Sequence, residues 1–301
     1  MLLCSASQRA TAFQSLPPPV APVRHTVLAD GHPLAVWEKR APSPKQAILL
    51  LHGRTWSALP DFDLQVAGEQ RSLMDALATQ GYAVYALDLR GYGSTPRDSS
   101  GWLSPERAAK DVAAAAQWIS THAALAKPPV VLGWSNGAMV AQLFAQRFPK
   151  QLSALVLFGY PFDPDMKIPV QPGLSTPLRQ TNTAHAAASD FITPGVISKK
   201  AIDAYVKAAL AADSVRADWR ELHEWNALNP AIITVPTLLI QAEFDPFAKS
   251  DAHARLFVRL GTADRQWIVL PNCDHAALLE DAQPAFVAAI HHFIQQPRPP
   301  K

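Results

Sequence analysis

Residues 133–137 read GWSNG and have the residue types and spacing expected around a nucleophilic serine. The pattern joins an apolar, β-branched run at 129–132 to a segment with apolar residues at helical spacing, 136–148. A strand that turns abruptly into a helix strains the corner residue, Ser135, and the two flanking glycines leave room for the crowding. The corner would lift the Ser135 hydroxyl above the sheet and set the Asn136 N–H beside it, at a helix N-terminus. We therefore predict that Ser135 is a nucleophile.

A serine hydroxyl is a weak nucleophile near neutral pH and needs a base within hydrogen-bond reach. Histidine suits this role because it accepts a proton and returns it, and a buried carboxylate can hold its tautomer and stabilise its charged form. His275 and Asp245 each follow an apolar run typical of a strand, as Ser135 does. Because such groups converge at the carboxyl ends of parallel strands, we predict that Ser135, His275 and Asp245 form one catalytic set.

The other nine histidines fit the role of base less well than His275. They lie at expected strand edges and helix ends, in or near an irregular region, or, for His52, in a turn after a strand. These residues are His25, His32, His52, His122, His185, His223, His253, His291 and His292.

The elements that must position this set are strands alternating with helices, which predicts a mostly parallel sheet covered on both faces. Asp30-Gly31 is typical of a hairpin turn between the first two strands. Ser104-Pro105-Glu106 is a typical helix start. We expect a last helix over about 276–294. The expected strands are 23–28, 33–39, 46–51, 82–87, 130–134, 152–158, 235–241 and 265–270.

Regular alternation fails over about 70 residues, which predicts an insertion in an otherwise continuous α/β domain. We expect helical pieces there at 198–211 and 215–227, and a loop over 54–66. The predicted organisation has five parts. They are a proline-rich arm at 1–22, a first core part at 23–159, a lid or cap at 160–230, a second core part at 231–295, and a tail at 296–301.

Composition excludes several classes of protein. Charged residues make up 17% of the 301 residues and the net charge is +2, with no clustered basic face of the kind that binds nucleic acid. No apolar run approaches the roughly 18 residues that span a bilayer. Cys4 and Cys273 lie at opposite ends of the chain and indicate no disulfide framework or metal site, so we treat both as free thiols.

Four motifs in this order resemble the α/β-hydrolase superfamily, in its serine hydrolase branch of carboxylesterase-like and lysophospholipase-like proteins. They are His52-Gly53, the DLRGYGS stretch at 88–94, GWSNG at 133–137, and EFD at 243–245 with CDH at 273–275. The resemblance covers roughly 24–295 apart from the insertion. It implies the α/β-hydrolase fold, with a mostly parallel sheet, helices on both faces and an inserted helical lid, and it matches the chain order Ser, Asp, His.

The resemblance also implies roles for residues outside this set. It assigns the second oxyanion-hole donor to the backbone N–H of Arg54, alongside that of Asn136, and gives His52 and Asp88 structural roles. The Arg54 side chain would either recognise a substrate carbonyl or carboxylate or pair with an acid of the lid. Asp163 is the alternative to Asp245, because some relatives place the acid after the strand that follows the serine.

The sequence gives more general predictions for several neighbouring residues. Asp165 is a weaker form of the Asp163 alternative, and Asp274 is expected to face solvent. Aromatic residues beside the motifs would line an apolar pocket, and the candidates are Trp56, Trp134, Tyr160 and Phe244.

The resulting hypothesis is a serine hydrolase that cleaves esters of small or medium apolar acyl groups through an acyl-enzyme. Thioesterases, lactonases, amidases or iminopeptidases, and a ligand-binding receptor that keeps the triad remain alternatives. An aminopeptidase would need acids in the lid to hold the substrate amine, and Glu221 and Glu224 are available there. A serine at 135 argues against an epoxide hydrolase, because resemblance to those enzymes would require an aspartate at this position.

No metal or organic cofactor is required by this chemistry. The expected partner is a small-molecule ester, with no nucleic acid, no transmembrane segment, and a homo-oligomer possible. The start of the chain lacks a basic segment and a long apolar run, which favours a cytoplasmic protein. A truncated signal peptide would instead indicate a periplasmic or secreted one.

Overall fold

The computed structural model describes residues 20–170 and 175–298. Most of the predicted N-terminal arm, Cys4 and the end of the tail therefore lie outside the described residues. An eight-stranded sheet forms the centre, and a separate pair of two-residue strands lies apart from it. The strands are β1 (Val23–Ala29), β2 (His32–Arg40), β3 (Gln46–Leu51), β4 (Tyr82–Leu87), β5 (Trp102–Leu103), β6 (Val130–Trp134), β7 (Ala154–Phe158), β8 (Asp218–Trp219), β9 (Thr237–Ala242) and β10 (Arg265–Leu270).

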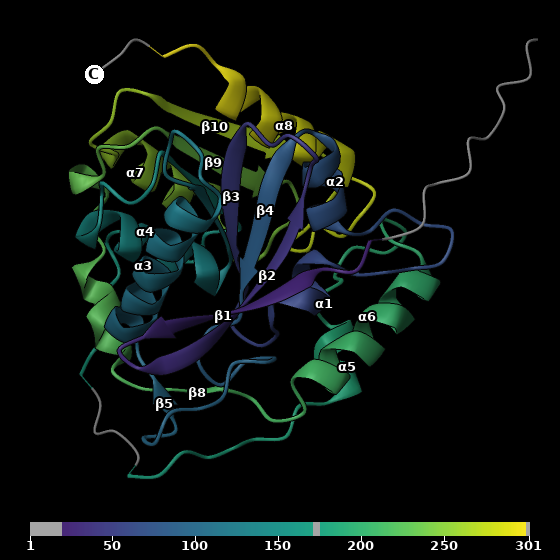
Figure 1. Ribbon diagram of the computed structural model, residues 1–301. Coiled ribbons are helices and arrows are strands. Elements are labelled where there is room, and N and C mark those ends of the chain that lie inside the picture. The colour runs from purple at the N-terminus through teal and green to yellow at the C-terminus, as the bar shows by residue number, and fades with distance from the viewer. Residues whose placement is uncertain (1–19, 171–174, 299–301) are drawn as a thin grey trace, which may run out of the picture.

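The strand order of the central sheet is β1-β2-β4-β3-β6-β7-β9-β10 (Figure 1). The β1–β2 hairpin, which turns at Asp30-Gly31, and the β2–β4 pair are antiparallel, and every other pair is parallel. The predicted α/β-hydrolase architecture with a mostly parallel sheet is therefore confirmed. Because β6, β9 and β10 run in the same direction, the residues that follow them meet at one edge of the sheet.

Alternate residues of the central strands pack into two different layers, as the two-residue period of a strand requires. In β3, Leu49 and Leu51 join the core beneath α3 (Pro105–His122), α4 (Asn136–Arg147) and α7 (Ser250–Arg259). Ile48 and Leu50 join the core on the opposite face, with α1 (Ala58–Phe62), α2 (Leu73–Thr79) and α8 (Gln283–Gln295). Both faces of the sheet are thus buried, which explains why its strands read as continuous apolar runs rather than alternating ones.

Most of the predicted helices are present. Ser104 caps α3 by accepting a hydrogen bond from the Arg107 N–H, with Pro105 in the first turn, as predicted. The helices are α1 (Ala58–Phe62), α2 (Leu73–Thr79), α3 (Pro105–His122), α4 (Asn136–Arg147), α5 (Ala184–Ala188), α6 (Lys199–Ala212), α7 (Ser250–Arg259) and α8 (Gln283–Gln295), with 3-10 turns at Leu222–Ala227 (η1) and Pro230–Ile232 (η2).

Three secondary-structure predictions are wrong. The expected loop 54–66 contains α1, and the expected helix 215–227 holds β8, which pairs with β5, followed by η1. The last helix begins at Gln283 rather than at 276, with Pro284 in its first turn. Proline is favoured in a first turn but removes a hydrogen bond further inside a helix. The helix α8 therefore begins just before Pro284 and does not extend back to residue 276.

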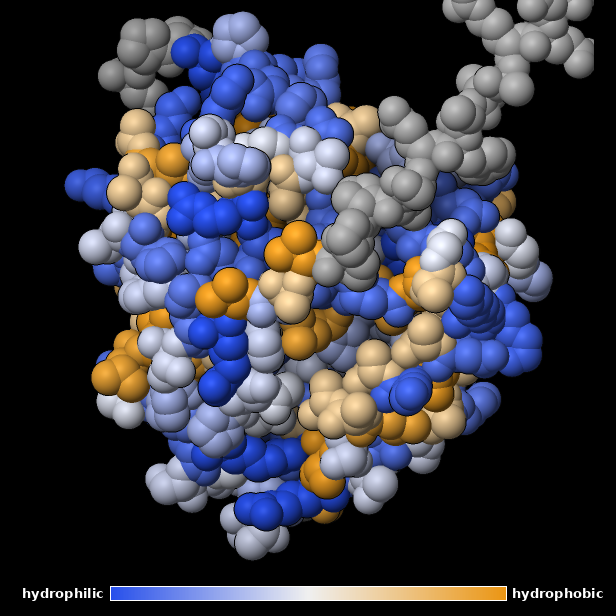
Figure 2. Space-filling view, turned by 45° about the vertical axis from the view of Figure 1, so that its right-hand side comes forward, coloured by the Kyte–Doolittle hydropathy of each residue, from blue (hydrophilic) through white to orange (hydrophobic). Residues whose placement is uncertain are grey.

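The segment between β7 and β9, residues 159–236, is called the insertion below. It carries α5, α6, β8 and the two 3-10 turns, and Ala187, Ala201 and Tyr205 from it are buried in the same core as α8. Figure 2 shows hydrophilic and hydrophobic residues intermixed over this side of the molecule, with hydrophobic ones gathered where α5 and α6 lie. No helix among the described residues is long and apolar enough to cross a membrane.

Candidate active site

Ser135 occupies the sharp turn between β6 and α4. Its φ of +56° lies in the left-handed region, which a residue with a side chain adopts only at some energetic cost. The Ser135 N–H donates to the Phe158 carbonyl at 2.9 Å and anchors the turn to β7. A Cβ on Gly133 would lie 2.2 Å from the Gly137 carbonyl oxygen, and one on Gly137 would lie 2.3 Å from the Leu51 carbonyl oxygen. Glycine is therefore required at both flanking positions, which gives the 133–137 pattern a physical cause.

Asp245 and His275, which follow β9 and β10, are in direct contact. The Asp245 Oδ2 lies 2.7 Å from His275 Nδ1, and both side chains are buried. The other carboxylate oxygen, Oδ1, accepts the backbone N–H groups of Phe247 and Ala248 at 2.9 and 3.2 Å. These amides orient the Asp245 carboxylate, and its bond to Nδ1 leaves His275 Nε2 free to exchange a proton.

His275 is also held against the turn that carries Ser135. Trp134, the residue before Ser135, donates its indole N–H to the His275 carbonyl oxygen at 2.7 Å, and the two rings lie 5.6 Å apart. Gly159, at the end of β7, has a φ of +57°, and a Cβ there would lie 2.9 Å from the His275 ring. The His275 loop and the Ser135 turn are therefore packed as one unit.

The alternative acids lie elsewhere. Asp163 pairs with Arg255 at 2.6 Å and Asp165 with Arg259 at 2.7 Å, both at partly exposed positions beside α7. The carboxylate beside His275 is that of Asp245.

The expectation that Asp274 faces solvent is wrong. Its side chain is fully buried and accepts the Ile192 N–H of the insertion at 3.0 Å. The Asp274 N–H in turn donates to Glu280 at 3.0 Å, and burial raises the pKa of Glu280 to about 9. This buried acid pair ties the His275 loop to the insertion.

His52 connects the loop after β3 to the loop after β4. Its Nε2 accepts the Leu89 N–H at 3.1 Å, so the proton resides on Nδ1, which donates to the Gly53 carbonyl at 2.9 Å. Complete burial lowers the pKa of His52 to about 4, which keeps the ring neutral. A Cβ on Gly53 would lie 3.7 Å from Ser135 Cβ, so this loop passes next to the serine at Gly53. The Tyr92 hydroxyl donates to the Arg54 carbonyl and holds the loop from outside.

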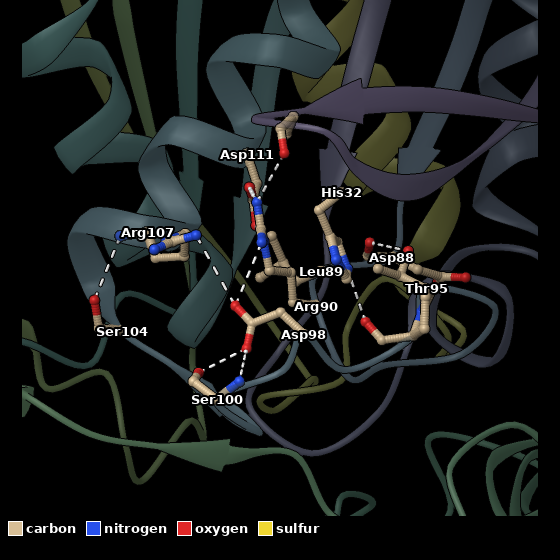
Figure 3. A network of polar contacts seen from close by, with 12 residues as sticks. His32, Asp88, Leu89, Arg90, Thr95, Asp98, Ser100, Ser104, Arg107 and Asp111 are labelled. Carbon is tan, nitrogen blue, oxygen red and sulfur yellow. Dashed lines mark hydrogen bonds and ion pairs between the residues drawn. The ribbon is translucent and has the colours of Figure 1, made fainter.

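The loop at 88–94 is a structural brace. Asp88 accepts the N–H groups of Ala58 and Ser94, each at 2.9 Å, and burial raises its pKa to about 6. Arg90 grips Asp111 of α3 through two hydrogen bonds of 2.7 and 2.8 Å and also reaches Asp98 (Figure 3). This network ties the loop to α3.

A buried acid cluster was not predicted from the sequence. The Tyr205 hydroxyl of α6 donates to Asp61 of α1 at 2.9 Å and lies 3.3 Å from Asp190 of the insertion. Burial raises the pKa of Asp190 to about 6, and the charges of His275 and Arg216 partly lower it again. Asp61 is fully buried and accepts the Gly53 N–H at 3.3 Å, which places the cluster beside the loop after β3.

No sequence signal could have found this acid cluster. Asp61 lies on a helix of only five residues, and Asp190 and Tyr205 lie in a region without a readable pattern.

The four aromatic pocket candidates have different surroundings. Trp134 is buried against His275, and Trp56 is buried beside Asp190, whose pKa its indole lowers. Tyr160 is buried in the core, and Phe244 is 47% exposed on the turn after β9. Phe247 instead packs edge-on against the His275 ring, with ring centres 5.0 Å apart. A role of these side chains in binding substrate stays a prediction.

Among the described residues, His25, Glu38 and His122 have ligand atoms close enough for a metal ion, within 4.8 Å of one another. They belong to β1, β2 and α3 rather than to the loops that carry Ser135 and His275. Both histidines lie within hydrogen-bond distance of Glu38, at 2.7 and 3.1 Å. Hydrogen bonds from the two histidines to Glu38 therefore account for the close approach of these three side chains.

Solved structures of several hydrolases share this fold. The thioesterase domain from the curacin biosynthetic pathway is 18% identical, with a TM-score of 0.66, over 90% of this chain and 99% of that one. The serine hydrolase CarC of carbazole degradation is 17% identical, with a TM-score of 0.64, over 91% and 99%. An epoxide hydrolase mutant from Vigna radiata is 17% identical, with a TM-score of 0.67, over 91% and 98%. At these identities the likeness shows the fold alone.

No curated protein matches the sequence. The profile of a family described as serine aminopeptidase, S33, matches residues 42–282, which include Ser135, Asp245 and His275. The chain therefore belongs to this family of α/β-hydrolases.

Proposed function

We propose that the protein is a serine hydrolase that cleaves carboxylic esters of small to medium apolar acyl groups through an acyl-enzyme. The observation that carries the proposal is the buried contact of 2.7 Å between Asp245 and His275, packed against the turn that holds Ser135. Ser135 attacks the ester carbonyl, and His275 accepts the hydroxyl proton at Nε2 and gives it to the leaving alcohol. Asp245 holds the imidazole with its proton on Nδ1 and stabilises its charged form.

The oxyanion of the tetrahedral intermediate needs two N–H donors. In this proposal they are the backbone amides of Asn136 and Arg54. Asn136 is the first residue of α4, where the N–H groups have no acceptor within the helix. The Arg54 amide belongs to the loop that His52 and Tyr92 hold next to Ser135. Water then hydrolyses the acyl-enzyme with His275 as base, and the insertion acts as the lid.

The test is steady-state turnover of p-nitrophenyl acetate, butyrate and octanoate by the wild type and by Ser135→Ala. We expect turnover of the shorter esters and its loss in the variant. Equal turnover by the variant would contradict Ser135 as the nucleophile. Fluorophosphonate labelling without turnover would instead support a receptor that retains an activated serine.

The buried acid cluster favours a second candidate, a peptidase acting on substrates with a free amine. Asp61 and Asp190 share one tyrosine hydroxyl and form no ion pair with a described lysine or arginine, so a protonated amine would complement them. Glu221 and Glu224 are less suitable, because Glu224 accepts the Glu106 N–H at 2.9 Å near the start of α3. Turnover of L-alanine and L-proline p-nitroanilides, lost in Asp190→Asn, would favour this candidate over the esterase.

A further inference from the structure

Two arginines at the loop after β3 lack acidic partners. Arg54 immediately follows Gly53, and its guanidinium lies over the Trp219 ring at 5.1 Å, a cation–π contact that fixes its direction. Arg216, from the insertion, donates to the Thr55 hydroxyl at 3.0 Å and so lies over the same loop. In the part of the chain that the structure describes, neither guanidinium forms an ion pair with a carboxylate.

Several other arginines have acidic partners, and Arg90 and Arg97 bind aspartates at 2.7 and 2.9 Å. Arg216 Nε is buried and has no hydrogen-bond partner. Burial lowers the pKa of Arg54, the Tyr92 hydroxyl raises it, and the nearby charge of Arg216 lowers it further. Two cations held together without an anion repel each other, and a bound anion would relieve that repulsion.

The surroundings limit what the anion could be. The pair lies at the loop after β3, whose Gly53 lies next to Ser135, so an anion held there can belong to the same molecule as the scissile ester. Asp190 lies within electrostatic range of Arg216 but does not pair with it, and it is held by Tyr205 instead. A planar carboxylate matches the fork of N–H donors that a guanidinium offers.

We propose that Arg54 and Arg216 form a carboxylate subsite, so that the preferred substrate is a half-ester of a dicarboxylic acid with its free carboxylate on the acyl side. This inference rests on the proposed esterase function and specifies its substrate class. The Ser135 turn cleaves the ester at one end of the acyl chain while the two guanidiniums hold the other end. Interactions of a charged group with an arginine pair are expected to change kcat/KM by about tenfold or more.

The test uses p-nitrophenyl hydrogen succinate, glutarate and adipate, each compared with the same compound capped as its methyl ester. Uncatalysed hydrolysis is subtracted throughout. In the wild type we expect the kcat/KM ratio of free acid to capped ester to exceed that of Arg216→Gln by about tenfold or more at the best chain length. Arg216→Lys, which keeps the charge without the fork, should retain part of the preference.

Arg220→Gln is the matched control, because it removes one exposed positive charge from the same strand region. It should keep the wild-type ratio. An equal fall in Arg220→Gln would indicate general electrostatic attraction and overturn the subsite, as would an unchanged ratio in Arg216→Gln.

A binding measurement separates failure of the subsite from failure of the esterase proposal. Calorimetry would titrate monomethyl glutarate into Ser135→Ala and into the double variant with Arg216→Gln. Saturable binding that weakens about tenfold or more in the double variant supports the subsite even without ester turnover. Absence of binding overturns the subsite, whereas fluorophosphonate labelling of Ser135 decides the esterase mechanism independently.

Discussion

The end of the sheet that carries Ser135 and the insertion between β7 and β9 are built in different ways. There, glycines 133 and 137 have carbonyl oxygens so close that a methyl group would not fit, and two backbone N–H groups hold the Asp245 carboxylate that contacts His275. The insertion reaches the site with single side chains, including Tyr205 and Arg216, attached to α6 and to a loop. Backbone packing therefore fixes the geometry around Ser135. Residues of the insertion can be substituted, and the substrate changed with them, without altering the Ser135 turn.

The largest expected effect separates the two candidate acids. Asp245→Asn should lower kcat by about 10⁴-fold, because an amide at this position favours the wrong tautomer of His275. Asp163→Asn should change kcat by less than about twofold, since it removes a partly exposed ion pair with Arg255. Ester turnover measures both, and a larger loss in Asp163→Asn would reverse the assignment.

Alanine substitution of one glycine in each region compares the two regions by the loss in free energy of unfolding. Gly133→Ala should prevent folding or lower the free energy of unfolding by more than about 3 kcal/mol, because its Cβ would meet the Gly137 carbonyl oxygen at 2.2 Å. Gly195→Ala, in the insertion, should cost about 1 kcal/mol, because the space is open and only its φ of +85° is unfavourable.

Urea unfolding and the yield of soluble protein measure this difference. Equal stability of the two alanine variants would contradict the close packing described at the turn.

Glu280 lies where the His275 loop meets the insertion, so the pH dependence of the free energy of unfolding tests this junction. Its pKa is raised from 4.5 to about 9, so the folded state retains a proton that the unfolded chain loses. Its contribution is fully present below pH 4.5 and is lost progressively as the pH rises toward 9. Glu280→Gln should therefore be more stable than the wild type at pH 8, by about 1 kcal/mol or more.

Denaturant titrations at pH 5 and pH 8 are the measurement. The gain should be larger at pH 8, and a gain confined to pH 5 would show that Glu280 is ionised in the folded protein.

The smallest effect concerns Asp190, whose pKa is raised to about 6 by burial. Between pH 5 and 7 its carboxyl gains a negative charge near His275, so the wild-type profile of kcat/KM should include this titration. Asp190→Asn should make the profile less steep there and change kcat/KM by less than about threefold at pH 8. Asp203→Asn on α6, an exposed partner of Lys199, is the control and should leave the profile unchanged.

Local sequence could predict the sheet and the proposed catalytic set because close packing leaves few alternatives there. Continuous apolar runs specify buried parallel strands, and the steric requirement at Gly133 and Gly137 appears directly as a pattern. Asp274 was misplaced because its burial depends on backbone amides of the insertion, which are distant in sequence. Asp61 and Arg216 were missed for the same reason, since only the packing of α1 and the insertion brings them to the loop after β3.

The most direct test of the central claim is active-site labelling. The folded wild type would be treated with a fluorophosphonate probe and digested, and the modified peptide identified by mass spectrometry, with Ser135→Ala and the exposed-site variant Ser189→Ala in parallel. The account predicts modification of Ser135 in the wild type and in Ser189→Ala, and none in Ser135→Ala. Lack of labelling in a folded wild type, or labelling that persists in Ser135→Ala, would contradict Ser135 as the activated nucleophile.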